Sequence, residues 1–240
     1  MKTLLRYCVG IDVSKDNLQV CLSVIDTDQH VRVKSTTAFA NQASGFQALF
    51  KWAAKHRRED LPLGYVMEST GVYHEALAWY LYQQDQTVSI LLPNKVKHYL
   101  MSLGHKSKND QMDALGLARM GLEQQLPLWQ PLSKNIYELR LLTRQHQRLQ
   151  ELKTQSLNQQ HALAASQFTD LFIVKQIDQL LALYDKQLAD IKDAIEELLK
   201  QDKPLQVKVA RLTAIKGLGL LSVATLVAET NGFTGFANQG

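Results

Sequence analysis

The chain has few cysteines and no long apolar run, the features of disulfide-linked and membrane-spanning folds. It contains only two cysteines, Cys8 and Cys21, and both fall in apolar stretches that we expect to be strands. We therefore predict two small buried thiols, with a disulfide or a metal site as the alternative. No apolar run reaches the ~18 residues of a membrane helix. The N-terminal apolar stretch is broken by Arg6 and Asp12, which indicates a first strand rather than a signal peptide and predicts a cytoplasmic location.

The sequence also has little excess charge of either sign. A net charge of +4 permits nucleic-acid binding but does not by itself indicate it. The composition, 45% hydrophobic and 21% charged with few prolines and glycines, is ordinary for a globular protein. Its 240 residues allow one large domain or two smaller ones with a buried core.

The first half of the chain predicts an α/β domain. Residues 7–13 form an apolar strand, and two alternating runs follow at 18–24 and 30–36 with a turn between them. Later elements alternate between helix and strand. They are a helix capped by Asn41, a strand at 63–68, a helix at 74–84, a strand at 87–92, and a closing helix at 109–122 capped by Asn109. This order is that of a ribonuclease-H-like fold, a mixed sheet flanked by helices.

Glycine is absent between Lys134 and Lys203, and proline returns only at Pro204. Apolar residues there recur every seven positions, with a second set four positions later, which is typical of a helix packing along another helix. The stripe comprises Ile177, Leu181, Tyr184, Leu188, Ile191, Ile195 and Leu198. We predict two long helices broken near Ser166–Thr169, as an antiparallel coiled-coil hairpin or a dimerisation arm. An ordinary helical subdomain is the alternative.

The last segment, IKGLGLLSVATLVAE, predicts a helix, a tight turn at Gly217 and Gly219, and a second helix. The amides at the start of that second helix would suit a phosphate, although a plain packing unit fits the pattern equally well. The sequence ends soon afterwards, too early for a self-sufficient domain. We therefore expect three regions: 1–128, 129–203 and 204–240.

Four acidic residues occupy places where an unpartnered charge is costly or where a helix begins. Asp12 lies inside the first strand and Glu68 ends the fourth, while Asp110 and Asp113 open the closing helix on one face. If that helix crosses the first and fourth strands, all four converge on one edge of the sheet. Carboxylates gathered there would bind two divalent ions, most naturally Mg²⁺ with Mn²⁺ as a substitute. The alternative for the helix pair is simple stabilisation of a helix N-terminus.

A basic stretch leads into the acid pair. Its lysines would carry phosphates toward the metal ions, although a solvated basic loop fits equally well. These residues are Lys95, Lys97, Lys106 and Lys108, with His98 and His105 among them. Tyr73 and Tyr99 would stack on bases or, more simply, pack in the core, and Lys15 would contact phosphate or pair with Asp16.

Several sequence blocks together resemble one family. The blocks are VGIDVSKDNLQVCL, MESTGVYHEALAWYL, LLPNKVKHYL, KSKNDQMDALGLARMG and, near the end, LTAIKGLGLLSVATLVAET. They are similar to the DEDD transposases of the insertion-sequence 110/1111 family, whose N-terminal domain resembles the RuvC-type Holliday-junction resolvases. One departure is Asn109, where a threonine is expected before the acid pair.

The resemblance implies a metal-dependent DNA transposase or recombinase. It assigns Asp12, Glu68, Asp110 and Asp113 as catalytic metal ligands, with Mg²⁺ as the cofactor. It also implies DNA and a structured guide RNA as partners. The family's serine nucleophile would lie in a Ser-Gly-type motif that this sequence does not contain, and Ser222 does not match it. If the sequence is complete, we expect a truncated product without full recombination activity.

Two other functions compete with this interpretation. The segment GIDVSK followed by a hairpin is also similar to the opening of sugar kinases and actin-like ATPases. That fold requires a second nucleotide-binding half, which the helical region from Lys134 does not offer. The other alternative is a non-catalytic, truncated transposase that binds RNA or DNA, or dimerises through the helical region as a competitor of the intact enzyme.

Overall fold

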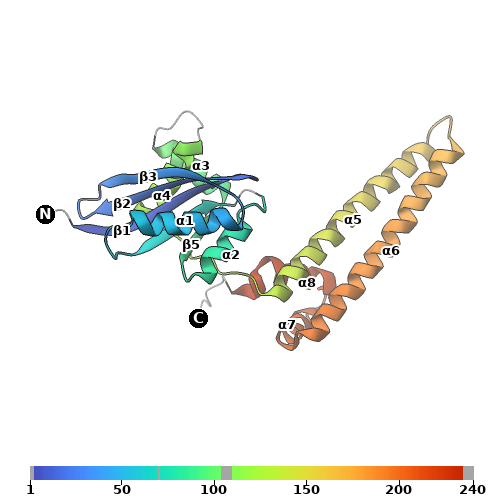
Figure 1. Ribbon diagram of the computed structural model, residues 1–240. Helices are drawn as coiled ribbons and strands as arrows, with labels where there is room; N and C mark the ends of the chain where they lie inside the picture. Colours follow the sequence, from blue (N-terminus) through green and yellow to red (C-terminus); the bar gives the residue numbers. More distant parts are fainter. Residues whose placement is uncertain (1–2, 70, 104–109, 235–240) are drawn as a thin grey trace. The chain divides into compact units, whose positions relative to one another are not determined.

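The computed structural model describes residues 3–69, 71–103 and 110–234, and the chain divides into two compact units (Figure 1). The first unit spans residues 1–131 and the second spans residues 132–240. Within the described residues, no helix is both long and apolar enough to cross a membrane.

One five-stranded sheet forms the centre of the first unit. Strands β1, β2 and β3 make an antiparallel meander, and β4 and β5 continue the sheet in parallel from the other side of β1. The strand order is therefore β3-β2-β1-β4-β5. The strands span Leu4–Val13 (β1), Asn17–Asp26 (β2), Val31–Ala40 (β3), Leu63–Glu68 (β4) and Thr87–Leu91 (β5). This is the predicted ribonuclease-H-like arrangement, and the fold-class prediction is confirmed.

Helices cover both faces of this sheet. Helices α1 (Ala43–His56) and α2 (Glu75–Gln83) pack on one face, over a core that includes Ile11 and Met67. Helices α3 (Pro93–Ser102) and α4 (Asp110–Glu123) pack on the other face, which carries Cys8, Val66 and Cys21. Because successive side chains of a strand point to opposite faces, each sheet residue is assigned to one helical layer by its position alone.

Helix α3 is an addition to the predicted element order. The sequence suggested only a basic segment between the strand at 87–92 and the closing helix, and that expectation was wrong for residues 93–102. A start signal was present, because Pro93 stands in the first turn, where its missing N–H costs nothing. Only Val96 of this helix is fully buried, so its apolar stripe is too narrow to stand out among the lysines.

The predicted cap of α1 was also wrong. The residue at the cap position is Gln42, and within the described part of the chain its side chain caps no helical N–H. Asn41 instead directs its amide away from the helix, toward the backbone of two other segments. The predicted cap at Asn109 lies outside the described residues.

Helix α4 lies very close to the backbone of β1 and β4. A Cβ atom added to Gly10 would overlap the carbonyl oxygen of Ala114 and the backbone nitrogen of Ala118. Farther along the helix, a Cβ on Gly121 would meet the side chains of Cys8 and Val66. Glycines at both positions, one on the strand and one on the helix, therefore permit this close approach.

The second unit consists mainly of a long helical hairpin (Figure 1). Helices α5 (Lys134–Ala164) and α6 (Leu171–Gln201) run antiparallel, as the prediction of a break near Ser166–Thr169 requires. Polar contacts fix their register at both ends. Asn135 Nδ2 donates to Asp202 at 2.8 Å, and Gln160 Nε2 donates to Asp178 at 2.6 Å. All seven residues of the predicted stripe on α6 are buried or half-buried.

Two short helices close the base of this hairpin. Helices α7 (Lys203–Thr213) and α8 (Leu220–Glu229) are joined by a turn in which Gly217 has a φ of +94°, a conformation that favours glycine. A short 3₁₀ helix, Asn231–Phe233, follows. One apolar core joins α5, α6, α7 and α8. Residues 132–240 thus form one compact unit. The division of the chain into the regions 1–128, 129–203 and 204–240 stays a prediction.

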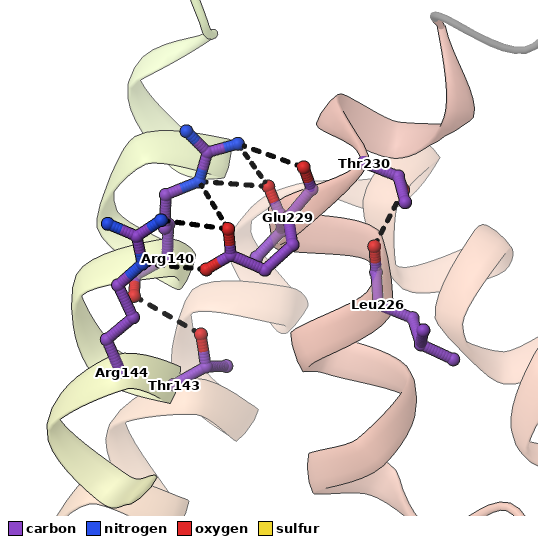
Figure 2. Close-up of polar contacts among 7 residues, drawn as sticks. Arg140, Thr143, Arg144, Leu226, Glu229 and Thr230 are labelled. Carbon is purple, nitrogen blue, oxygen red and sulfur yellow. Dashed lines mark hydrogen bonds and ion pairs between the residues drawn. The ribbon is translucent and has the colours of Figure 1, made fainter. Parts of the chain in front are cut away.

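Two arginines attach α8 to α5 (Figure 2). Arg140 Nη2 donates to the carbonyl oxygens of Ala228 at 2.8 Å and of Glu229 at 3.3 Å, at the end of α8. Arg144 donates two hydrogen bonds to the Glu229 carboxylate, at 2.7 and 2.9 Å. A positive charge at the carbonyl end of a helix is stabilising, so this contact fixes the position of α8.

We expect Gly10→Ala to destabilise the first unit by about 3 kcal/mol, because the helix backbone cannot move away without losing its other contacts. Gly64→Ala is the matched control, since an added Cβ meets no atom within 4 Å, and it should be neutral or slightly stabilising. Urea unfolding followed by tryptophan fluorescence reports on this unit alone, because Trp52, Trp79 and Trp129 all lie in it. Equal midpoints for the two variants would contradict the close packing of α4.

In the second unit, Arg140→Ala should cost roughly 1.5–3 kcal/mol, since it leaves carbonyl oxygens without a charged donor. Arg144→Ala should cost less than about 1 kcal/mol because its ion pair is exposed.

Hydrogen bonding to Arg144, above all, lowers the pKa of Glu229 from its ordinary 4.5. The contribution of this pair is therefore present at neutral pH and is lost as the pH falls through the folded pKa. Urea unfolding followed by helical circular dichroism at neutral and acid pH measures both effects.

Candidate metal centre at the edge of the sheet

Asp12 and Glu68 lie side by side at the ends of two parallel strands. In the register of β1 and β4, Gly10 pairs with Val66 and Ile11 pairs with Met67. The next residue is Asp12 on β1 and Glu68 on β4. Both acids are half-buried. By strand alternation they share the sheet face of Gly10 and Val66, which is the face that α4 covers.

The start of α4 lies at this same edge. Gly121 packs against Cys8, and the more N-terminal Ala114 and Ala118 pack against Gly10, so α4 runs opposite to β1. The N-terminus of the helix therefore lies toward the carboxyl end of β1, where Asp12 stands. Asp113, directly before Ala114, is half-buried.

Asp110 begins α4, and its side chain lies outside what the structure describes. The carboxylate oxygens of Asp12, Glu68 and Asp113 do not all lie within 4.8 Å of one another, as the ligand atoms of one compact single-ion site would. A site for two ions ~3.5–4 Å apart has a wider ligand set, because its carboxylates lie on both sides of the ion pair. The oxygen-only donors of this edge fit hard divalent ions such as Mg²⁺.

One compact acidic group does occur among the described residues, on the turn between β2 and β3. It consists of Asp26, Asp28 and His30. Asp26 is buried and accepts hydrogen bonds from the backbone N–H groups of Asp28 and His30, each at 3.1 Å. Although burial opposes it, these bonds and the nearby Arg32 lower the pKa of Asp26. The carboxylate thus already has a structural role in the turn.

Local hydrogen bonds fix the backbone that follows each strand acid. After Asp12, Ser14 and Asn17 form a tight turn in which Ser14 N–H donates to the Asn17 carbonyl oxygen at 2.9 Å, and Ser14 Oγ accepts from Asn17 N–H at 3.1 Å. After Glu68, Ser69 donates both its N–H and its hydroxyl to the Leu91 carbonyl oxygen, at 2.9 and 3.2 Å. The backbone after Asp12 is therefore fixed by a turn, and the backbone after Glu68 is fixed by the end of β5.

A groove next to Asp12 was not predicted from the sequence. It has a volume of about 220 Å³ and is lined by Gln19, Val20, Thr36, Thr37, Ala38 and Ala114. Gln19 is the antiparallel partner of Asp12, and Ala38 is in turn the partner of Gln19. No local pattern in the sequence marks this groove, because it depends on the strand register that places Gln19 opposite Asp12 and so brings an uncharged hydrogen-bonding group beside this acid.

The predicted phosphate-binding lysines divide into two sets. Lys95 and Lys97 are exposed on α3, whereas Lys106 and Lys108 lie outside the described residues, as does His105. Tyr99 has a packing role, because it is half-buried against the α3–α4 core and donates a 2.7 Å hydrogen bond to Glu123. Burial and this bond raise the pKa of Tyr99. Tyr73 and Lys15 are exposed.

The two cysteines are free and buried, as predicted. Burial, above all, raises the pKa of both thiols. Because the thiolate is the reactive form, neither cysteine is suited to act as a nucleophile or a metal ligand.

A family model described as a transposase, of the DEDD insertion-sequence-110 type, matches residues 9–169. The chain belongs to this transposase family. The match covers both strand acids, the acid pair of α4 and all of α5, and it confirms the resemblance on which the four ligands were assigned. The roles of the individual residues remain predictions.

Two curated relatives of this family member are the pilin gene-inverting proteins of Moraxella bovis and Moraxella lacunata. Each is 28% identical over 211 residues, which is 88% of this chain and 62% of the relative. The chain thus spans about three fifths of the length of these relatives.

Two solved structures also match the chain. They are Thermus thermophilus RuvC (13% identity, TM-score 0.39) and RuvC of T. thermophilus in complex with a Holliday junction substrate (12% identity, TM-score 0.38). Each match covers 51% of this chain and 99% of the RuvC chain.

Proposed function

We propose that this transposase-family chain cleaves and joins DNA strands at a metal centre formed by Asp12, Glu68, Asp110 and Asp113. The observation that carries the proposal is the meeting of two strand ends and one helix start at a single edge of the sheet. Four carboxylates at such an edge repel one another, and a divalent cation is the partner that offsets this repulsion.

Mg²⁺ ions bound there, or Mn²⁺ in their place, would polarise a phosphodiester and activate an attacking water or 3′-hydroxyl. The side chains of the protein would position the ions and the DNA. The carboxylates fix where the ions bind, while Lys95, Lys97, Lys106 and Lys108 would attract the DNA backbone. We assign no side chain of this chain as a covalent nucleophile.

The proposed partners are the ends of the mobile element, its target DNA and a structured guide RNA. The curated relatives are named for inverting a gene, which is a rearrangement of DNA, and we extend that class of substrate to this chain. The guide RNA rests on the family resemblance alone. An RNA- or DNA-binding competitor without catalytic activity is the alternative, and the measurements below separate it from an active enzyme.

The metal centre predicts Mn²⁺ binding that isothermal titration can measure. Asp12→Ala and Asp113→Ala should each weaken the affinity by more than about 10-fold, because each removes a direct ligand. Asp28→Ala is the matched control, since it removes an acid of the β2–β3 turn instead. A loss confined to the control would place the ion at the turn, and unchanged affinity in all three variants would contradict the proposed centre.

Activity requires a second measurement on the same variants. Nicking of supercoiled DNA carrying the element's ends, in the presence of Mg²⁺ and the element's RNA, should disappear with Asp12→Ala and persist with Asp28→Ala. Wild-type protein that takes up Mn²⁺ and binds this DNA without nicking it would favour the non-catalytic alternative.

We also propose that two copies associate through the helical hairpin. Three apolar side chains stand exposed at its tip, Phe168 (85% exposed), Leu171 (82%) and Phe172 (69%). Such a concentrated apolar patch favours contact with another protein surface, and a second hairpin offers the same patch.

Sedimentation equilibrium tests this association. Phe168→Asp combined with Phe172→Asp should shift the chain from dimer to monomer without loss of helical circular dichroism, because both side chains are already exposed. Leu141→Asp, at an exposed position near the base of α5, should leave the association unchanged. A wild-type protein that is monomeric at high concentration would rule out the tip as a self-association surface.

A further inference from the structure

Asn41 connects three segments at the edge of the sheet where the strand acids lie. It stands between β3 and α1, and its side-chain Nδ2 donates to the Ser14 carbonyl oxygen at 2.8 Å and to the Tyr73 carbonyl oxygen at 3.0 Å. Its backbone N–H donates to the Asp16 carbonyl oxygen at 2.9 Å. One residue thus holds the turn after β1 and the segment before α2.

The two carbonyl oxygens belong to the segments that follow the two strand acids. Ser14 lies two residues after Asp12, and Tyr73 lies five residues after Glu68. On their other sides these segments are already anchored, by the Ser14–Asn17 turn and by the bonds from Ser69 to Leu91. The Asn41 amide is therefore a direct polar link between the Asp12 side and the Glu68 side beyond the last paired residues of β1 and β4.

From this geometry we infer that Asn41 is a positioning residue, whose amide fixes the separation of Asp12 and Glu68 for metal binding. This inference rests on the proposed metal centre. Ligand carboxylates must be held to within about 0.5 Å of their productive geometry, and supporting hydrogen bonds supply that precision. Asn41 itself would contact neither the ions nor the DNA.

An amide is the group that these contacts require. A primary amide nitrogen has two hydrogens, one for each carbonyl oxygen, whereas a carboxylate has no donor and an alanine has no polar group. Asn41→Asp keeps the size of the side chain, removes both donors and brings a negative charge against two carbonyl oxygens. The two linked segments should then separate, and with them the ends of β1 and β4.

The charge of this variant makes the test decisive. A carboxylate added near a cation site should by itself tighten Mn²⁺ binding through Coulomb attraction. A positioning role predicts the opposite, a loss of about 10-fold or more. Gln42→Glu is the matched control, because it adds the same charge one residue away and removes an amide that, among the described residues, donates only to Ser44 Oγ, at 3.1 Å.

Mn²⁺ affinity should be measured by titration of the full chain, with tryptophan fluorescence confirming that the first unit is folded. We expect weak binding for Asn41→Asp, unchanged or tighter binding for Gln42→Glu, and partial recovery for Asn41→Gln, which retains both donors on a longer side chain. If Asn41→Asp does not fold, Asn41→Ala provides the same comparison without the added charge.

The outcomes separate the two levels of the proposal. Affinity in Asn41→Asp and Asn41→Ala equal to that of wild type would overturn the positioning role and leave the metal centre intact. A wild-type chain that binds no Mn²⁺ would overturn the metal centre and the role of Asn41 with it.

Discussion

The close packing of α4 on β1 is the contact on which the candidate site depends. It requires two positions without a side chain, Gly10 on the strand and Gly121 on the helix, and it brings backbone against backbone. A helix held this tightly has little freedom to slide, because each step along its axis would place a larger residue over Gly10. The position of Asp113 at the sheet edge therefore follows from the packing of α4 at the adjacent Ala114, and not from any attraction between the acids.

Strand register has the same importance for the other two acids. A slip of one residue between β1 and its neighbours would move Asp12 to the opposite face, where Ile11 and Met67 now lie in the apolar core. Burying a carboxylate there would cost several kcal/mol, while Ile11 would move to the face that α4 covers, where the backbone of the helix leaves room only for Gly10. The apolar core under α1 and α2 thus selects the register that presents Asp12 and Glu68 to α4. Stability and the candidate chemistry are determined by the same pairing.

The sequence predicted the sheet because its signals are local. Apolar and alternating runs identify each strand, and the order of helices and strands then leaves few topologies. The stripe from Ile177 to Leu198 likewise identified the buried face of α6, since seven-residue periodicity is a property of one helix alone. Helix α3 was missed because only Val96 is fully buried, so its periodicity is weak. The groove beside Gln19 was missed because it exists only after β2 and β3 pair and α4 closes one side.

Asn41 shows why partners are harder to predict than elements. An asparagine just before an apolar helix is a strong local signal for a cap, and a helix does begin two residues later. A cap would use the side-chain oxygen as an acceptor, but the carbonyl oxygens of Ser14 and Tyr73, 27 and 32 residues away in sequence, accept from Nδ2 and so orient the side chain away from the helix. Both carbonyls lie in turns, where the backbone has no neighbouring strand to supply a donor, whereas the first N–H groups of an exposed helix can bond to water. The long-range bonds therefore outweigh the local one, and the asparagine serves the edge of the sheet instead of the helix.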